Sequence, residues 1–392
     1  MKNSNVAADI EQPRLWSREF VTIIAINLGT FMGFQMLLPT LPVLAKHLGG
    51  SDSAAGLVVG IFAISALLAR PISGHAVDRF GRKVMLLGGL ILFTASVFAY
   101  HWAVTLGMLF LTRFVHGLGW GISSTASSTT ATDVIPKSRM GEGMGYFSLA
   151  GTASMALAPA AGLWVMSQYG FNALFNTAAA LVLAAVIMAV FLRYPQVPLS
   201  GKKQGALFEK PALAPAIVIF FLTMSYGAIV SFIALYAKEL GIDNIGPFFT
   251  VYAVALFFTR PFAGKAADKW GYDSMVIPGI CCMAGAMMML GMSDSMTGFL
   301  MAAVLYGLGF GAVAPCLQTL AVIFSPPERR GSANGTYFTG FDLGIGLSSV
   351  LWGFVAQAVG YSSMYMWTLA PVTMGLLLYL KYRPQQMGRK KQ

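Results

Sequence analysis

Long apolar stretches constrain the fold of this chain more than any other feature of its sequence. About twelve of them, each close to the roughly twenty residues that a helix needs to cross a bilayer, are separated by short polar breaks. Hydrophobic residues make up 56% of the 392 residues and charged residues only 10%, which excludes a soluble globular fold. Backbone groups in lipid must be hydrogen-bonded internally, and these stretches are too long and too evenly apolar for barrel strands. We therefore expect membrane-spanning helices.

The hydropathy pattern predicts twelve spans, with boundaries accurate to a few residues. They lie at residues 20–44, 52–75, 84–101, 104–130, 140–165, 171–193, 212–237, 246–266, 275–292, 297–323, 332–356 and 362–381. A polar loop with two adjacent lysines separates the sixth span from the seventh. The predicted organisation is a cytoplasmic tail at 1–19, a six-helix bundle at 20–193, a cytoplasmic linker at 194–211, a second six-helix bundle at 212–381 and a basic cytoplasmic tail at 382–392.

Lysine and arginine are distributed unevenly between the two sides of the predicted membrane. Twenty-one of the 26 fall in the two tails and in the loops of one side. The loops of the other side hold only Lys46 and Lys238, and Arg70, Arg113 and Arg260 lie within spans. Because basic loops remain in the cytoplasm, we expect both termini there. The net charge of +11 is thus explained by topology, and we expect no nucleic-acid partner.

The cysteine pattern argues against a metal or redox site. Only Cys281, Cys282 and Cys316 are present, all within apolar runs, so neither a disulfide framework nor a C-x-x-C motif is available. We expect no metal and no cofactor.

An internal repeat appears when the chain is aligned with itself so that Arg70 falls on Arg260. Three pairs of segments match at this single offset. The first is Arg70-Pro71-x-x-Gly74-x-Ala76-x-Asp78-Arg79-x-Gly81 with Arg260-Pro261-x-x-Gly264-x-Ala266-x-Asp268-Lys269-x-Gly271. The second is His116 to Gly121 with Tyr306 to Gly311, and the third is Arg139-x-Gly141-x-x-x-Gly145 with Arg329-x-Gly331-x-x-x-Gly335. The offset contains six spans, an even number, so the two halves have the same orientation. We expect a pseudo-two-fold axis along the membrane normal, with any polar pathway on it.

The first copy of this repeat resembles the loop motif G-x-x-x-D-[RK]-x-G-[RK]-[RK] of the major facilitator superfamily of secondary transporters. Its marked positions are Gly74, Asp78, Arg79, Gly81, Arg82 and Lys83, and the second copy keeps Gly264, Asp268, Lys269 and Gly271. The fourth span is similar to the family pattern L-x-x-x-R-x-x-Q-G-x-G, with Leu109, Arg113, Gly117 and Gly119 in place and His116 where glutamine is usual. The resemblance covers about residues 20 to 382. It implies an all-α integral membrane protein with twelve transmembrane helices in two six-helix bundles.

The resemblance also implies a cytoplasmic gate. It places Asp78 against the N-terminus of the eleventh span, near Gly331, where a carboxylate is stabilised by about 0.3 to 1 kcal/mol. We interpret Asp78, Arg79 and Asp133 as a latch that holds the halves together; the alternative, which is compatible with a latch, is that Asp78 and its neighbours orient the loop by their charge. Glu142, at the start of the fifth span, either caps that helix or belongs to the same cluster.

Ionisable groups within the bilayer cost about 2.5 to 3.5 kcal/mol at a helix centre, so each is a candidate for function. At 1.5 Å per residue, Arg113 and Asp342 lie about 13 to 17 Å from the ends of their spans. We expect Asp342 to exchange a proton or bind a cationic ligand, the alternative being a permanent salt bridge. Arg113 would hold a carboxylate or respond to a nearby proton, and His116 would carry a proton or supply a hydrogen bond.

A polar and aromatic stripe continues from Arg113 and His116 along the fourth span, at helical spacing. Trp120, Ser124 and Ser127 follow on the same face, which we expect to line the central cavity; the alternative for the hydroxyls is helix packing. The uncharged cavity candidates on other spans are Asn27, Gln35, Tyr226, Tyr252, Tyr306, Gln318 and Tyr337.

The fifth span bears on the direction of transport. The antiporter motif of the family is G-x-x-x-G-P-x-x-G-G, and the matching stretch here keeps Pro159 and Gly162 but has Ala158 in place of a glycine. The sequence lacks a Walker motif, so an ion gradient, with the proton as coupling ion, is the expected energy source.

These features favour a proton-coupled antiporter that exports a small amphipathic drug or metabolite by alternating access. The resemblance is to bacterial efflux proteins, whose substrates are often organic cations or zwitterions. The expected partners are that substrate and the lipid bilayer, with the protein acting as a monomer in the bacterial cytoplasmic membrane. One alternative is a proton-coupled importer of a small polar solute such as a sugar or organic acid. A remoter one is a receptor or enzyme on the carrier fold; no catalytic constellation supports an enzyme.

Overall fold

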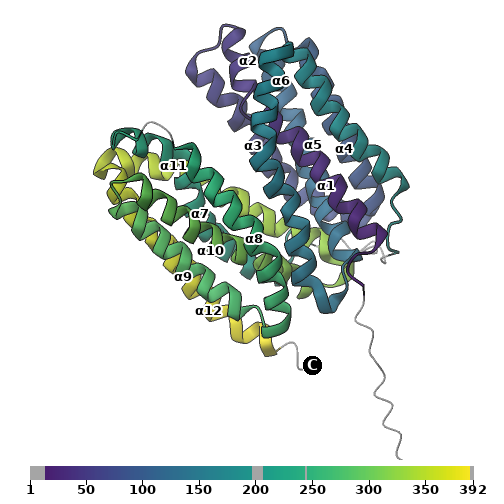
Figure 1. Ribbon diagram of the computed structural model, residues 1–392. Coiled ribbons are helices and arrows are strands. Elements are labelled where there is room, and N and C mark those ends of the chain that lie inside the picture. The colour runs from purple at the N-terminus through teal and green to yellow at the C-terminus, as the bar shows by residue number, and fades with distance from the viewer. Residues whose placement is uncertain (1–13, 197–205, 243–244, 389–392) are drawn as a thin grey trace, which may run out of the picture.

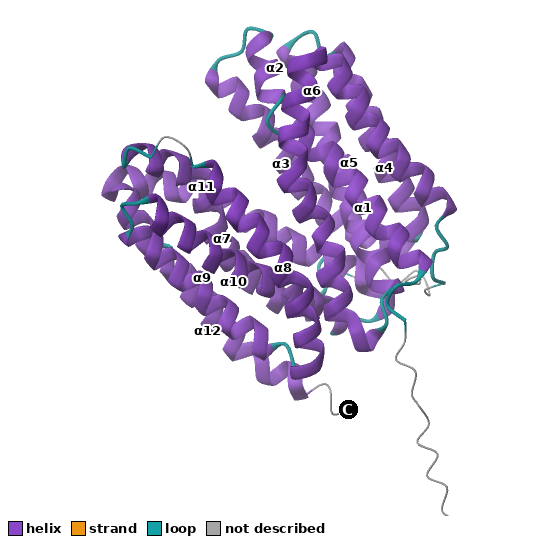
Figure 2. Cartoon of the chain, in the orientation of Figure 1, coloured by secondary structure: helices purple, strands orange, loops and turns teal. Residues whose placement is uncertain are grey.

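The chain is almost entirely helical across the residues that the computed structural model describes, 14–196, 206–242 and 245–388 (Figure 2). No strand occurs among them. The helices are α1 (Arg18–Leu37), α2 (Leu41–His47), α3 (Asp52–Phe80), α4 (Arg82–Ala99), α5 (Leu106–Val134), α6 (Met140–Phe191), α7 (Lys210–Glu239), α8 (Gly246–Trp270), α9 (Asp273–Met292), α10 (Met296–Ile323), α11 (Arg330–Trp367) and α12 (Leu369–Gly388). Parts of the predicted tail at 1–19, linker at 194–211 and tail at 382–392 lie outside the described residues.

The helices differ from the predicted spans at three places, where a helix boundary does not coincide with the end of a span. The first span is divided into α1 and α2. The fifth and sixth spans form the continuous element α6, which bends at Gly170, where φ is 80°. Likewise α11 bends at Gly360, with φ of 79°, and the seven residues of α11 after this glycine form the twelfth span together with α12. Glycine adopts this left-handed conformation without the steric cost of a side chain, so the chain reverses direction there.

The membrane-spanning character follows from length and composition. Eight helical stretches of the described chain are long and apolar enough to cross a membrane, and two of these, 137–191 and 327–383, each contain two predicted spans. The two remaining spans are α5, with its run of Ser and Thr at 123–130, and α8, which carries Arg260 and Lys265. The prediction of an all-α membrane protein with twelve transmembrane helices is confirmed.

The repeat seen in the sequence is also present in the backbone. Every positive-φ residue among the described residues is a glycine, and these glycines occur as matching pairs in the two halves. The pairs are Gly49 with Gly241, Gly81 with Gly271, and Gly170 with Gly360. The last two pairs have the same offset as the sequence repeat. The two halves therefore share their turns as well as their motifs.

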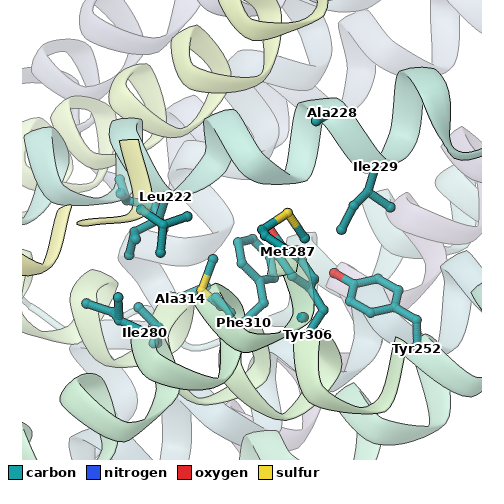
Figure 3. Packing of buried hydrophobic residues seen from close by; sticks show 14 of the residues in the cluster. Leu222, Ala228, Ile229, Tyr252, Ile280, Met287, Tyr306, Phe310 and Ala314 are labelled. Carbon is teal, nitrogen blue, oxygen red and sulfur yellow. The ribbon is translucent and has the colours of Figure 1, made fainter. Parts of the chain in front are cut away.

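Each half has its own hydrophobic core. One cluster of buried apolar residues lies within residues 15–192 and the other within 212–379. In the second half, Leu222 of α7, Ile280 and Met287 of α9 and Phe310 of α10 pack together (Figure 3). Figure 1 shows the two halves meeting near the end that carries the C-terminus and diverging toward the opposite end. We call the region where they meet the closed end; there the last turns of α3 and α8 contact the first turns of α11 and α6.

Candidate functional site

Asp78 joins the two halves at the closed end. It lies near the end of α3, and its carboxylate accepts hydrogen bonds from the backbone N–H groups of Gly331, at 2.8 Å, and Ser332, at 2.7 Å. The Ser332 hydroxyl donates a third, also at 2.7 Å. The first N–H groups of a helix have no partner within it and carry partial positive charge, which favours an anion at this position. This is the contact with the N-terminus of the eleventh span that the family resemblance implied.

The same contact occurs a second time, related by the repeat. Asp268 of α8 accepts hydrogen bonds from the backbone N–H groups of Gly141, at 2.9 Å, and Glu142, at 2.8 Å, at the start of α6. The helices approach closely because a glycine stands at each crossing. A Cβ atom on Gly74 would lie 2.5 Å from the Gly331 carbonyl oxygen, and one on Gly264 would overlap the Gly141 carbonyl oxygen.

Asp133 connects to both halves beside Asp78. Its carboxylate pairs with Arg82 Nε of the first half at 2.8 Å and with an Arg330 guanidinium nitrogen of the second half at 2.8 Å. Arg82 also donates to the Pro327 carbonyl oxygen, at 3.0 Å. The trailing arginine of the loop motif thus contributes a contact between the halves.

The prediction that Arg79 belongs to the latch needs correction. Arg79 is exposed and its guanidinium lies over the ring of Phe80. One residue beyond Asp78 on a helix, its side chain is rotated about 100° away from the interface. Lys83 and Lys269 are exposed as well. The buried Glu142 pairs with Arg139 Nε at 2.7 Å, and its backbone N–H binds Asp268, so it lies in the cluster around Asp268.

Replacing Asp78 with asparagine should destabilise the purified protein. The change removes the negative charge that accepts two backbone hydrogen bonds, and such charge-assisted bonds are worth about 1.5 to 3 kcal/mol each. We expect a lower thermal midpoint, measured by intrinsic fluorescence in detergent. Asp294→Asn, at an exposed loop position, is the matched control and should leave the midpoint almost unchanged. Equal midpoints for the two variants would contradict a structural role for Asp78.

An ion pair joins the halves farther from the closed end. Arg70 Nε of α3 lies 2.9 Å from Asp342 Oδ2 of α11. Arg70 also donates to Ser124 Oγ at 2.6 Å, and its guanidinium lies 4.5 Å from the ring centre of Phe338. Arg70 is 4% exposed, whereas the Asp342 side chain is 25% exposed. The carboxylate is thus accessible while its partner is buried.

Arg70 was absent from the predicted site. Two signals in the sequence indicated it: its place within a span and its repeat in Arg260. In the sequence alone these arginines bear only on the topology. The spacing along one chain does not show which arginine of one half reaches an acidic residue of the other.

Arg113 and His116 occupy a different place from the predicted one. Both are completely buried in the first half, where Arg113 Nε donates to the Val58 carbonyl oxygen at 2.9 Å and a guanidinium nitrogen lies 3.4 Å from His116 Nδ1. The other contact of His116 Nδ1 is the Tyr100 hydroxyl, at 2.9 Å. Among the described residues Arg113 holds no carboxylate. The polar stripe continues along α5, but α3 and α4 pack over the part of it that contains Arg113 and His116. The role of His116 as a proton carrier stays a prediction.

The remaining cavity candidates fall into separate groups. In the first half, Trp120 stacks on Phe34 with ring centres 4.5 Å apart, and Asn27 donates to the Phe147 carbonyl oxygen at 3.3 Å. The Gln35 side-chain oxygen is buried without a hydrogen-bond partner among the described residues. These residues do not bridge the halves.

Gln318 instead bridges the halves. Its amide donates to Ser128 Oγ of the first half, at 2.6 Å, and to Asn334 Oδ1, at 3.0 Å. Ser128 also donates to Asn334 Oδ1, at 3.1 Å. The network is buried, and neither Ser128 nor Asn334 was among the predicted site residues.

The four tyrosine candidates gather in the second half. Tyr226 stacks on Phe310 with ring centres 5.2 Å apart, and Tyr252 is the next neighbour, 6.2 Å from Tyr226. Tyr306 bonds Ser225 Oγ at 2.9 Å, and Tyr337 donates to the Ala314 carbonyl oxygen at 2.8 Å. Tyr252, Tyr306 and Phe310 lie near one another in Figure 3.

The antiporter-like motif lies where α6 packs on α1. Pro159 is inside α6, and a Cβ atom on Gly162 would overlap the Met36 carbonyl oxygen. Gly162 therefore allows the two helices to approach closely, as small residues do in membrane bundles. The connection of this motif with export stays a prediction.

Two repeated helical bundles, joined through polar contacts at one end, define a multi-pass membrane protein of the transporter class. A model of the Major Facilitator Superfamily matches residues 23–249 and 215–392. The chain therefore belongs to the major facilitator superfamily, as the sequence resemblance indicated. It is a transporter of small molecules rather than an enzyme, and transporters of this family typically need no cofactor.

Individual relatives support the same assignment. The chain is 25% identical over 368 residues to an uncharacterized MFS-type transporter of Methanocaldococcus jannaschii, a match that covers 90% of this chain and 95% of that protein. It is 26% identical over 377 residues to the multidrug resistance protein MdtG of Salmonella schwarzengrund, covering 90% and 91%. The fold resembles the crystal structure of the MFS transporter FucP in the outward conformation, with a TM-score of 0.76, 14% identity and coverage of 92% and 98%.

Proposed function

We propose that this protein is a proton-coupled antiporter that exports small amphipathic molecules across a bacterial cytoplasmic membrane, acting as a monomer with cytoplasmic termini. The observation that carries the proposal is the ion pair between Arg70 of one half and the partly exposed Asp342 of the other. A carboxylate that exchanges a proton and also bridges the two halves can couple proton movement to the motion of one half relative to the other. The similarity to a multidrug resistance protein and the retained Pro159 and Gly162 support export.

In this proposal the closed end faces the cytoplasm. The basic residues of the loops lie on that side, and basic loops are retained in the cytoplasm. Asp78 and Asp268 hold this end shut while the halves diverge toward the opposite end (Figure 1), which in this proposal faces outward. Asp342 would then receive protons from outside, because its side chain is partly exposed and the cytoplasmic end is closed.

Protonation of Asp342 would remove the charge that holds Arg70. The contact between the halves weakens, the closed end opens, and the proton leaves toward the cytoplasm. After substrate binds from the cytoplasm, the deprotonated carboxylate pairs with Arg70 again and the outward-facing state returns. Proton and substrate thus move in opposite directions, and the substrate does not have to bind the Asp342 carboxylate that carries the proton. An ion pair is suited to this use because its strength depends on the protonation of one partner.

A second candidate, proton-coupled import of an organic acid, is favoured by one detail of the same pair. When Asp342 is protonated, Arg70 becomes free to hold a substrate carboxylate, and proton and anion would enter together. The direction of movement relative to the proton gradient separates the two functions.

Everted membrane vesicles with an acidified lumen provide the test. The probes are three fluorescent compounds with one dansyl body: anionic dansylglycine, neutral dansylglycinamide and cationic dansyl-ethylenediamine. An exporter that exchanges substrate for protons should accumulate at least one probe in the lumen, and an ionophore that collapses the pH gradient should stop it. Probe movement out of the acidified lumen would show symport, and no proton-dependent movement of any probe would contradict the proposed function.

A further inference from the structure

The charges inside the membrane do not balance. Among the described residues, Arg70, Arg260 and Asp342 are the ionisable groups of fixed sign more than two turns from a helix end, and Arg113, about two turns into α5, is completely buried. Only Arg70 is paired with a carboxylate. Uncompensated charge in a low-dielectric interior is costly and marks a functional group. The interior therefore has an excess of positive charge, which disfavours a cationic ligand and favours an anion.

Arg260 is the repeat partner of Arg70 but lacks its partners. At the offset that relates these two arginines, Thr152 stands where Asp342 would be and Ala314 stands where Ser124 would be. Arg260 therefore has neither the carboxylate nor the hydroxyl that Arg70 holds.

The guanidinium group of Arg260 does not use all of its N–H groups in hydrogen bonds. One nitrogen donates to the Ser148 carbonyl oxygen of α6, in the other half, and Nε has no hydrogen-bond partner among the described residues. The side chain is only partly buried, unlike Arg113, which is fully enclosed. At about ten residues from the end of α8, Arg260 lies about 15 Å from the closed end, close to the depth of Arg70. An unsatisfied, partly accessible arginine at this depth is placed to meet a ligand between the halves.

An aromatic cluster begins about two turns from Arg260 on the same helix. Tyr252 precedes Arg260 by eight residues of α8, its ring centre lies 6.2 Å from that of Tyr226, and Tyr226 stacks on Phe310. Tyrosine rings offer apolar faces together with hydroxyl groups, a combination that suits a ligand with one apolar and one polar part.

We propose that Arg260 binds the carboxylate of an amphipathic organic anion, with the partly buried ring of Tyr226, backed by Tyr252 and Phe310, in contact with its apolar body. Arginine holds carboxylates through paired N–H donors, and the guanidinium keeps its charge throughout the cycle. The site deepens the proposed function by naming its substrate class and rests on that function only for the direction of transport. It also revises the expectation of cationic substrates, because the one interior carboxylate among the described residues is already occupied by Arg70.

Binding of the three dansyl probes to the purified protein in detergent tests the site. We expect the wild type to bind dansylglycine at least about tenfold more tightly than dansylglycinamide, since a hydrogen bond to a charged group supplies this discrimination. Arg260→Gln should abolish the preference and Arg260→Lys should keep part of it. Lys265→Gln, which removes an exposed positive charge from the same helix, should leave the preference intact.

The outcomes separate this proposal from the antiport proposal. A wild type that binds dansylglycine no better than the amide or the amine would overturn the anion site without any variant having to fold. A preference that survives in a monodisperse Arg260→Gln protein would overturn it too. Arg260-dependent binding of dansylglycine without proton-driven movement in vesicles would refute antiport alone. Proton-driven accumulation of dansyl-ethylenediamine that is insensitive to Arg260→Gln would refute the anion site alone.

Discussion

Asp342→Asn should abolish proton-driven probe accumulation in everted vesicles, lowering its initial rate at least about 100-fold. Asparagine keeps the shape of the carboxylate but cannot titrate, and it leaves the buried Arg70 without its counter-ion. Removing one partner of a buried ion pair costs about 3 to 5 kcal/mol, and each 1.4 kcal/mol is a factor of ten. Because Asp342 is partly exposed, we take the lower end of that range.

Two further variants make this result specific. Asp342→Glu restores a titrating carboxylate and should recover most of the coupled transport. Asp294→Asn removes an exposed carboxylate from a loop of the same half and should have no effect. Normal gradient-driven accumulation by the Asp342→Asn protein would remove Asp342 from the coupling mechanism.

Gly264→Ala should open the closed end. The added methyl group would overlap the Gly141 carbonyl oxygen, and because this atom belongs to the backbone of α6, only separation of the helices relieves the overlap. Overpacking costs about 1 to 3 kcal/mol, enough to shift the balance between the closed and open forms by roughly tenfold or more. Spin labels on cysteines replacing the exposed Lys83 and Lys269, one in each half, should report a longer and broader distance distribution.

Gly285→Ala is the matched control for this experiment. A Cβ atom there meets nothing within 4 Å, so alanine should leave the distance distribution unchanged and slightly favour the helix. The native cysteines are first replaced by alanine so that the labels are unique. An unchanged distance in the Gly264→Ala protein would show that the crossing of α6 and α8 does not hold the end closed.

The sequence predicted the contact of Asp78 with the start of α11, but only through a family resemblance. Its own pattern shows a carboxylate at a helix end and a glycine four residues earlier. The second contact, from Asp268 to the start of α6, follows from the repeat, because equivalent residues in like-oriented halves occupy equivalent places. Arg79 was wrongly included, since a motif position does not state on which side of the helix its side chain falls.

The pairing of the charged residues inside the spans, in contrast, could not be predicted from the sequence. Depth along a helix indicated Asp342 as an interior residue of its span, but the partner of Asp342 is 272 residues away in sequence. Arg113 has a similar predicted depth and a polar stripe, yet it packs inside one half. Helical periodicity describes the faces of one helix and does not show which neighbouring helices cover them.

What the sequence determined by itself is the set of membrane helices and their repetition. Both follow from local physics: apolar length and an even number of spans per repeat, whereas the orientation inferred from the basic loops stays a prediction. Only the tertiary structure decided that Asp342 holds Arg70 and that Arg260 is left without a carboxylate. The reason is that pairing between charges depends on distance in space, and two halves folded from distant segments bring together residues that no spacing along the chain relates.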